Sequence, residues 1–137
     1  MIAQAQARAQ VGNVRFLQAD VFDDALAEAG FDVVMGFNLF HLMDDVPAAL
    51  TRIHALLAPG GLFISKTPCL GEPSLGWKFA LLMRLLPLMQ WVGKAPFVKV
   101  GTIADLDAQI TEAGFRIIET GNYPLRPPSH FVVAQRL

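Results

Sequence analysis

The sequence has few features that would cross-link the chain or attract it to a charged partner. Its 137 residues include 1 cysteine, Cys69, so no internal disulfide can form, and this fits a reducing, cytoplasmic environment. The balance of 11 basic and 12 acidic residues leaves a net charge of -1, which argues against a nucleic-acid-binding surface. The opening residues MIAQAQARAQ lack the apolar centre of a signal peptide, so we do not expect secretion.

Strand and helix patterns alternate along the first half of the sequence. In chain order we expect a helix at 2–10, a strand at 14–20, a helix at 23–29, a strand at 31–37, a helix from Pro47 that breaks at 58–61, and a strand at 62–67. The run FDVVMGF at 31–37 is apolar enough for a strand that is covered on both faces. This alternation predicts the α/β fold class, with helices flanking a mostly parallel sheet.

The C-terminal part of the sequence predicts one helix followed by two antiparallel strands. Thr102 is a typical N-cap and Asp105 follows at the capping-box spacing, so a helix begins here and ends at Gly114. Strands at 115–120 and 130–135 are joined by the short Pro-rich link NYPLRPPS. A link of this length favours antiparallel pairing.

The hydrophobic fraction of 53% is slightly above the usual globular share, and the densest apolar segment, residues 75–92 (LGWKFALLMRLLPLMQWV), accounts for much of this excess. A transmembrane helix needs roughly 20 apolar residues with few or no charges, whereas Lys78, Arg84 and Pro87 interrupt this run. We therefore expect a broken, partly exposed helix, inserted into the fold at about 71–100.

Four segments resemble, in order, those of the class I S-adenosylmethionine-dependent methyltransferases. FLQADVFD resembles the strand whose terminal acidic residue lies beside adenine, and FDVVMGFNLFHL resembles the fourth strand and its loop. LTRIHALLAPGGLFISKTP is similar to the helix, Pro-Gly-Gly turn and fifth strand, and DLDAQITEAGFRIIET to the final helix and sixth strand. Each motif alone is common, but the four together are more specific. The resemblance implies a Rossmann-like fold, S-adenosylmethionine as cofactor and methyl transfer to a small-molecule acceptor.

The sequence departs from this family at its start, because no G-x-G-x-G turn precedes Val14. In the family that loop approaches the methionine part of the cofactor, and the strand after it ends in an acidic residue that holds the ribose. We therefore expect residues 1–137 to be a partial methyltransferase domain that lacks the first strands of the full fold. On this interpretation Met1 is an internal methionine, and the chain is inactive alone.

The resemblance assigns the cofactor contacts to two strand ends. Asp20 would accept a hydrogen bond from the adenine amino group, and the Val21 N–H would reach a ring nitrogen. Capping of a helix that begins near Asp23 is the alternative role for Asp20. Phe37 ends the next strand and Asn38 follows it, at the edge where doubly wound sheets bind ligands, although Asn38 is also a typical turn former.

Three further residues are candidates for the substrate pocket. His41 could act as a general base near neutral pH, but a lone histidine between apolar neighbours is often only packed. Trp77 and Phe79 could line an apolar acceptor pocket, or could simply pack as a core. Their segment suggests an apolar or lipid-like acceptor and weak contact with a neutral membrane surface. We assign no catalytic residue, because methyl transfer from a sulfonium requires mainly alignment of the reactants.

Other functions remain open at this stage. Asp44 and Asp45 have no third oxygen ligand nearby and suit a helix start, so we predict no metal site. A nicotinamide-dependent enzyme would also need the Gly-rich turn. The main rival is a non-catalytic α/β remnant or a homo-oligomerising interaction module, because missing central strands would leave exposed sheet edges.

Overall fold

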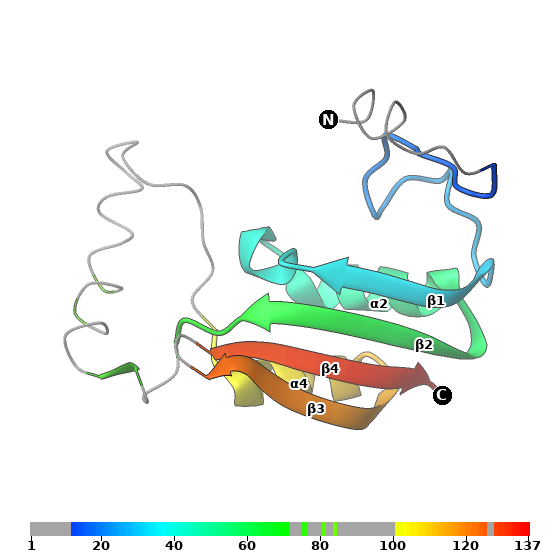
Figure 1. Cartoon of the computed structure of the whole chain (residues 1–137). Helices are drawn as coiled ribbons and strands as arrows, with labels where there is room; N and C mark the ends of the chain where they lie inside the picture. Colours follow the sequence, from blue (N-terminus) through cyan, green and yellow to red (C-terminus); the bar gives the residue numbers. More distant parts are fainter. Residues whose placement is uncertain (1–11, 72–74, 77–80, 82–83, 85–100, 126–127) are drawn as a thin grey trace.

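The computed structural model describes residues 12–71, 75–76, 81, 84, 101–125 and 128–137. They contain one four-stranded sheet in the order β1-β2-β4-β3 (Figure 1). The strands are β1 (Phe31–Phe37), β2 (Leu57–Pro68), β3 (Phe115–Leu125) and β4 (Pro128–Arg136). β1 and β2 run parallel, whereas β4 is antiparallel to both β2 and β3. The α/β class and the antiparallel C-terminal pair are therefore confirmed.

Helix α2 (Val46–Leu56) begins where the sequence predicts it. Asp45 is its N-cap and accepts a hydrogen bond from the Ala48 N–H at 2.9 Å, so the helix-start interpretation of Asp45 is confirmed. The helix runs directly into β2. The expected break at 58–61 lies inside that strand as a bulge, because Phe31 pairs with Leu57 but Val33 pairs with Leu62.

Helix α4 (Ile103–Glu112) has the predicted capping box. Thr102 Oγ1 accepts the Asp105 N–H at 3.1 Å, and the Asp105 carboxylate accepts the Thr102 N–H at 3.3 Å. Gly114 follows the helix at φ +92, where a Cβ atom would lie 3.0 Å from His54 Nε2. Glycine therefore satisfies both the left-handed backbone and the close approach of α2.

The core lies between the sheet and the two helices, which cover the same face (Figure 1). Phe63 is at its centre, with its ring centroid 5.8 Å from that of Phe40 and 5.5 Å from that of Phe115. Phe40 belongs to the short 3-10 helix η1 (Phe40–Leu42) that follows β1. Leu50, Ile53 and other buried α2 residues complete the packing.

Two predicted elements are absent from the described residues. Residues 14–20 form no strand and residues 23–29 form only turns and bends. A strand needs a neighbour for its ladder hydrogen bonds, and β1 is paired only with β2 among the described strands. Without that partner, the sequence preference of residues 14–20 is insufficient to form a strand.

The predicted coverage of β1 on both faces is also wrong. Its alternate residues point away from the helices and are exposed: Phe31, Val33, Met35 and Phe37. The predicted helix at 2–10 and most of the apolar run at 75–92 lie outside the described residues. None of the helices in the described part of the chain has the length and hydropathy required to cross a lipid bilayer.

Candidate functional site

The carboxyl ends of the two parallel strands meet at one edge of the sheet. Phe37 and Asn38 end β1 there, next to Lys66 of β2, and η1 brings His41 to the same edge. Asn38 has φ 54, and its N–H donates to the Lys66 carbonyl at 2.8 Å. The turn-forming role of Asn38 is therefore present. Its cofactor role and that of Phe37, which is 53% exposed, stay predictions.

The Asp20 carboxylate is held in a local turn. Its Oδ1 accepts the Phe22 N–H at 3.0 Å, and its carbonyl accepts the Asp23 N–H at 3.1 Å. The side chain thus caps a turn rather than a helix. The neighbouring Val21 packs against the core through its side chain. The adenine contacts assigned to Asp20 and Val21 stay predictions.

Arg52 of α2 fixes the loop that follows Asp20. Its Nη1 donates to Glu28 Oε1 at 3.0 Å, and its Nη2 donates to the carbonyls of Asp23 and Leu26 at 3.3 and 3.1 Å. The Ala29 N–H also donates to Ala55 of the same helix. The loop is therefore attached to α2 although it contains no helix of its own.

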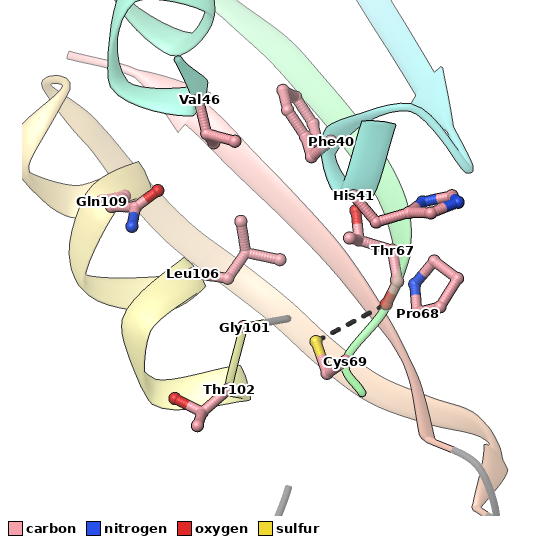
Figure 2. Close-up of a pocket in the computed structure, with 10 residues that line it drawn as sticks. All are labelled: Phe40, His41, Val46, Thr67, Pro68, Cys69, Gly101, Thr102, Leu106 and Gln109. Atoms are coloured by element: carbon pink, nitrogen blue, oxygen red, sulfur yellow. Dashed lines mark hydrogen bonds between the residues drawn. The ribbon is translucent and has the colours of Figure 1, made fainter. Parts of the chain in front are cut away.

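A small pocket opens beside the carboxyl end of β2, between η1 and α4 (Figure 2). It has a volume of about 50 Å³. Ten residues line it: Phe40, His41, Val46, Thr67, Pro68, Cys69, Gly101, Thr102, Leu106 and Gln109. Of these, the sequence had singled out only His41 for a pocket. The others are brought together because α4, which packs on β3 and α2, lies beside the carboxyl end of β2, and no local pattern specifies this arrangement.

Two polar atoms at this pocket are buried without a hydrogen-bond partner in the described part of the chain, His41 Nδ1 and Thr67 Oγ1. Burial lowers the pKa of His41 below its usual 6.5, which favours the neutral imidazole at pH 7. Cys69 is buried, and its thiol donates to the Thr67 carbonyl at 3.6 Å. A neutral, mostly apolar pocket results.

Gly71 and Gly101, which bracket most of the predicted insertion in the sequence, lie side by side. The Gly71 N–H donates to the Gly101 carbonyl at 3.0 Å, and a Cβ on Gly71 would lie 2.9 Å from that same carbonyl group. Gly71 and Gly101 are therefore held together, and Gly101 lines the pocket. Trp77 and Phe79 belong to the predicted insertion and lie outside the described residues.

A buried histidine that the sequence analysis did not single out lies behind the pocket. His130 of β4, the ladder partner of Thr67, has Nε2 2.8 Å from Asp107 Oδ1 and Nδ1 3.0 Å from Asn122 Oδ1. This cluster joins α4 to both antiparallel strands. The described residues contain no group of three side chains able to hold a metal ion.

Comparisons with known proteins agree with this architecture. The family model described as "Methyltransferase domain" matches residues 1–61. An uncharacterized methyltransferase of Mycobacterium tuberculosis is 36% identical over 61 residues, which are 44% of this chain and 31% of that protein. The mitochondrial arginine-hydroxylase NDUFAF5 of Danio rerio is 31% identical over 104 residues, 71% of this chain and 32% of that protein. The chain thus spans about a third of the length of the curated relatives it matches.

A solved structure extends the likeness to the whole chain. The S-adenosylmethionine-dependent methyltransferase of Mesorhizobium loti matches 99% of this chain and 76% of its own, with a TM-score of 0.75 and 22% identity. At that identity the match establishes the fold alone.

Proposed function

Because the chain belongs to the class I S-adenosylmethionine-dependent methyltransferases, we propose that the full-length enzyme transfers a methyl group to a small, apolar or lipid-like acceptor. One observation carries the choice of acceptor. An apolar pocket opens at the carboxyl edge of β1 and β2, the edge at which doubly wound sheets bind ligands. The lining of this pocket suits an uncharged group better than a charged one.

The cofactor half of the proposal rests on exposed groups in the turn at Asp20 and at the end of β1. S-adenosylmethionine supplies an activated methyl group, and the protein has to hold it in line with the acceptor. Asp20 offers an exposed carboxylate on a turn, and Phe37 offers an exposed ring at the end of β1. These two groups, with Val21 and Asn38, fit the adenosine end of the cofactor. No G-x-G-x-G turn is present for its methionine end, so we propose that the 137-residue chain is inactive alone.

Calorimetry with S-adenosylmethionine tests the cofactor assignment. We expect no micromolar binding to the 137-residue chain, and binding to a chain extended upstream in frame through a Gly-rich turn. In the extended chain Asp20→Ala should weaken binding by about 1 kcal/mol, the value of one hydrogen bond. Asp24→Ala is the matched control, since Asp24 is also an exposed acid of this loop. Equal effects of the two substitutions, or unfolding by Asp20→Ala alone, would reject the adenine contact.

The apolar run at 75–92 supports a lipid-like acceptor, because Gly71 and Gly101, which bracket it in the sequence, are joined by a hydrogen bond and Gly101 lines the pocket. Trp77 and Trp91 are the two tryptophans of the chain, and both belong to this run. Neutral liposomes or a long-chain acceptor should therefore shift tryptophan emission to the blue, with little dependence on salt. Emission that is already blue and does not respond would exclude this role.

A second candidate function is a homo-oligomerising module in which the open sheet face meets a second copy. The observation in its favour is the exposure of Met35 at 65% and Phe37 at 53% on a strand with an unpaired edge among the described residues. Analytical ultracentrifugation distinguishes the two. A dimer that Met35→Lys dissociates supports the module, and a monomer at all concentrations excludes it.

A further inference from the structure

The polar atoms of the pocket residues are largely withdrawn from the cavity. Thr67 Oγ1 and His41 Nδ1 are fully buried, and Figure 2 shows the His41 ring extending away from α4. The Thr102 hydroxyl donates to the Asp105 carboxylate at 2.7 Å and accepts the Asp105 N–H at 3.1 Å. The Cys69 thiol donates to the Thr67 carbonyl. A ligand in the pocket therefore meets mainly carbon and sulfur.

The walls of the pocket are apolar and uncharged. Phe40, Val46 and Leu106 belong to the core, and their side chains also line the pocket. None of the ten lining residues carries a charge once His41 is neutral, and the Gln109 amide is the further polar group. A hydrocarbon group gains free energy by leaving water for such a surface, whereas a charged group would lose its hydration without gaining a partner. The pocket therefore favours hydrocarbon groups.

The volume of the pocket, about 50 Å³, limits how much of a ligand can enter. One water needs roughly 10–15 Å³, so the pocket holds roughly three to five groups of that size, such as methylenes. Pockets that enclose a whole small molecule measure roughly 300–1,000 Å³, and an apolar cavity that binds benzene measures roughly 150 Å³. The pocket can therefore take neither a complete acceptor of ordinary size nor an aromatic ring.

We infer that this pocket is a subsite for the end of an alkyl chain. It holds roughly the last three to five carbons of the chain, and the rest of the molecule, including the methyl-accepting atom, lies outside. Leu106 is the specificity-determining residue, because its side chain forms the wall on α4. This inference narrows the acceptor of the proposed function to alkyl rather than aryl compounds, and it rests on that function for the role of the ligand.

A series of straight-chain alcohols measures the capacity of the pocket directly. In NMR titrations of the 137-residue chain, from ethanol to 1-butanol, we expect binding to tighten about fourfold per added carbon, equivalent to about 0.8 kcal/mol for a buried methylene. Beyond about five carbons the gain should fall, because further carbons remain outside. The shift changes should centre on Val46, Cys69 and Leu106, which line the pocket.

Benzyl alcohol tests the exclusion of aromatic groups. It offers a larger apolar group than 1-butanol, so apolar area alone would make it the tighter ligand. We expect the opposite order, because the ring is too large to enter the pocket. This comparison uses the unmodified chain and does not depend on the folding of any variant.

Leu106→Ala removes most of the wall on α4 and should widen the pocket. We expect it to tighten the binding of benzyl alcohol about tenfold and to move the limit of the alcohol series to longer chains. Ile110→Ala is the matched control, because Ile110 is fully buried on the same helix but does not line the pocket. It should leave the affinities for both alcohols unchanged, and thermal melts would show that both variants fold.

Four results would overturn the inference. They are equal or tighter binding of benzyl alcohol by the unmodified chain, an affinity that rises by the same factor up to 1-octanol, no binding of any alcohol at the pocket, and an equal response of Leu106→Ala and Ile110→Ala. None of these measurements requires S-adenosylmethionine. The calorimetric test of the proposed function can therefore succeed or fail independently of them.

Discussion

The two faces of the sheet differ sharply although their residues are similarly apolar. On the face covered by α2 and α4, Phe63 and Val132 are 0% exposed. On the opposite face, Met35 is 65% exposed and Val33 is 45% exposed. The register shows that Met35 lies beside Ile64 and that Ile64 lies beside Val133, so apolar side chains continue across three strands of the open face.

This difference shows that an apolar sequence alone does not ensure that both faces of a strand are buried. Burial of β1 requires a second layer on its open face, and no described helix supplies one (Figure 1). The covered face is a completed core, whereas the open face resembles an interface. Substitutions on the two faces should therefore have unequal effects.

The largest effect is expected from the centre of the covered face. Phe63→Ala removes a ring that packs between Phe40 and Phe115 and leaves a cavity. It should lower the free energy of unfolding by about 3–5 kcal/mol, measured by urea denaturation followed by circular dichroism. A loss below about 1 kcal/mol would mean that this core is loosely packed.

An intermediate loss of stability is expected from a substitution at Gly71, which contacts Gly101. A Cβ on Gly71 would lie 2.9 Å from the Gly101 carbonyl, whereas a Cβ on Gly101 would have no heavy atom within 4 Å. Gly71→Ala should therefore destabilise the fold by about 1–3 kcal/mol, and Gly101→Ala should have little effect. Equal thermal midpoints for the two variants would show that Gly71 and Gly101 are not in close contact.

Acid should lower the stability of the fold through His54, which packs on the covered face of the sheet. Burial lowers the pKa of His54 below 6.5, the Arg136 guanidinium lowers it further, and a backbone hydrogen bond at Gly114 opposes both. Because the folded-state pKa lies below the unfolded value, His54 stabilises the fold fully above pH 6.5, and this stability declines as the pH falls through the folded-state pKa. Thermal midpoints should drop on acidification, and less steeply in His54→Gln. An unchanged pH profile in that variant would contradict the assignment.

The smallest effect is expected on the open face. Met35→Ala should change the free energy of unfolding by about 0.5 kcal/mol or less, since the side chain is largely in solvent. The same urea titration as for Phe63→Ala makes the two values directly comparable. A loss above about 2 kcal/mol would show that this face is covered in solution.

Elements with local signals were predicted well. Asp45 and the pair Thr102 and Asp105 cap their helices as expected, because capping involves residues no more than three positions apart. The turn features of Asp20 and Asn38 were foreseen for the same reason. The strand at 14–20 was not found, because a strand depends on a partner that its own residues cannot provide.

In the candidate site, too, the feature with a local signal was predictable and the feature that depends on distant segments was not. The edge that carries Phe37, Asn38 and His41 was predictable, since parallel strands end together. The pocket was not predictable, because its lining combines Thr67 of β2 with residues of α4, which begins more than 30 residues further along the chain.

The sequence by itself therefore determined the α/β class, both helices with their caps and the family resemblance, all of which depend on local patterns and their order. Only the tertiary structure decided which face of the sheet is covered and which residues line the pocket. The physical reason is that burial is a property of pairs of surfaces. Met35 and Phe63 are both large apolar strand residues, yet only Phe63 is opposed by helices in the described part of the chain.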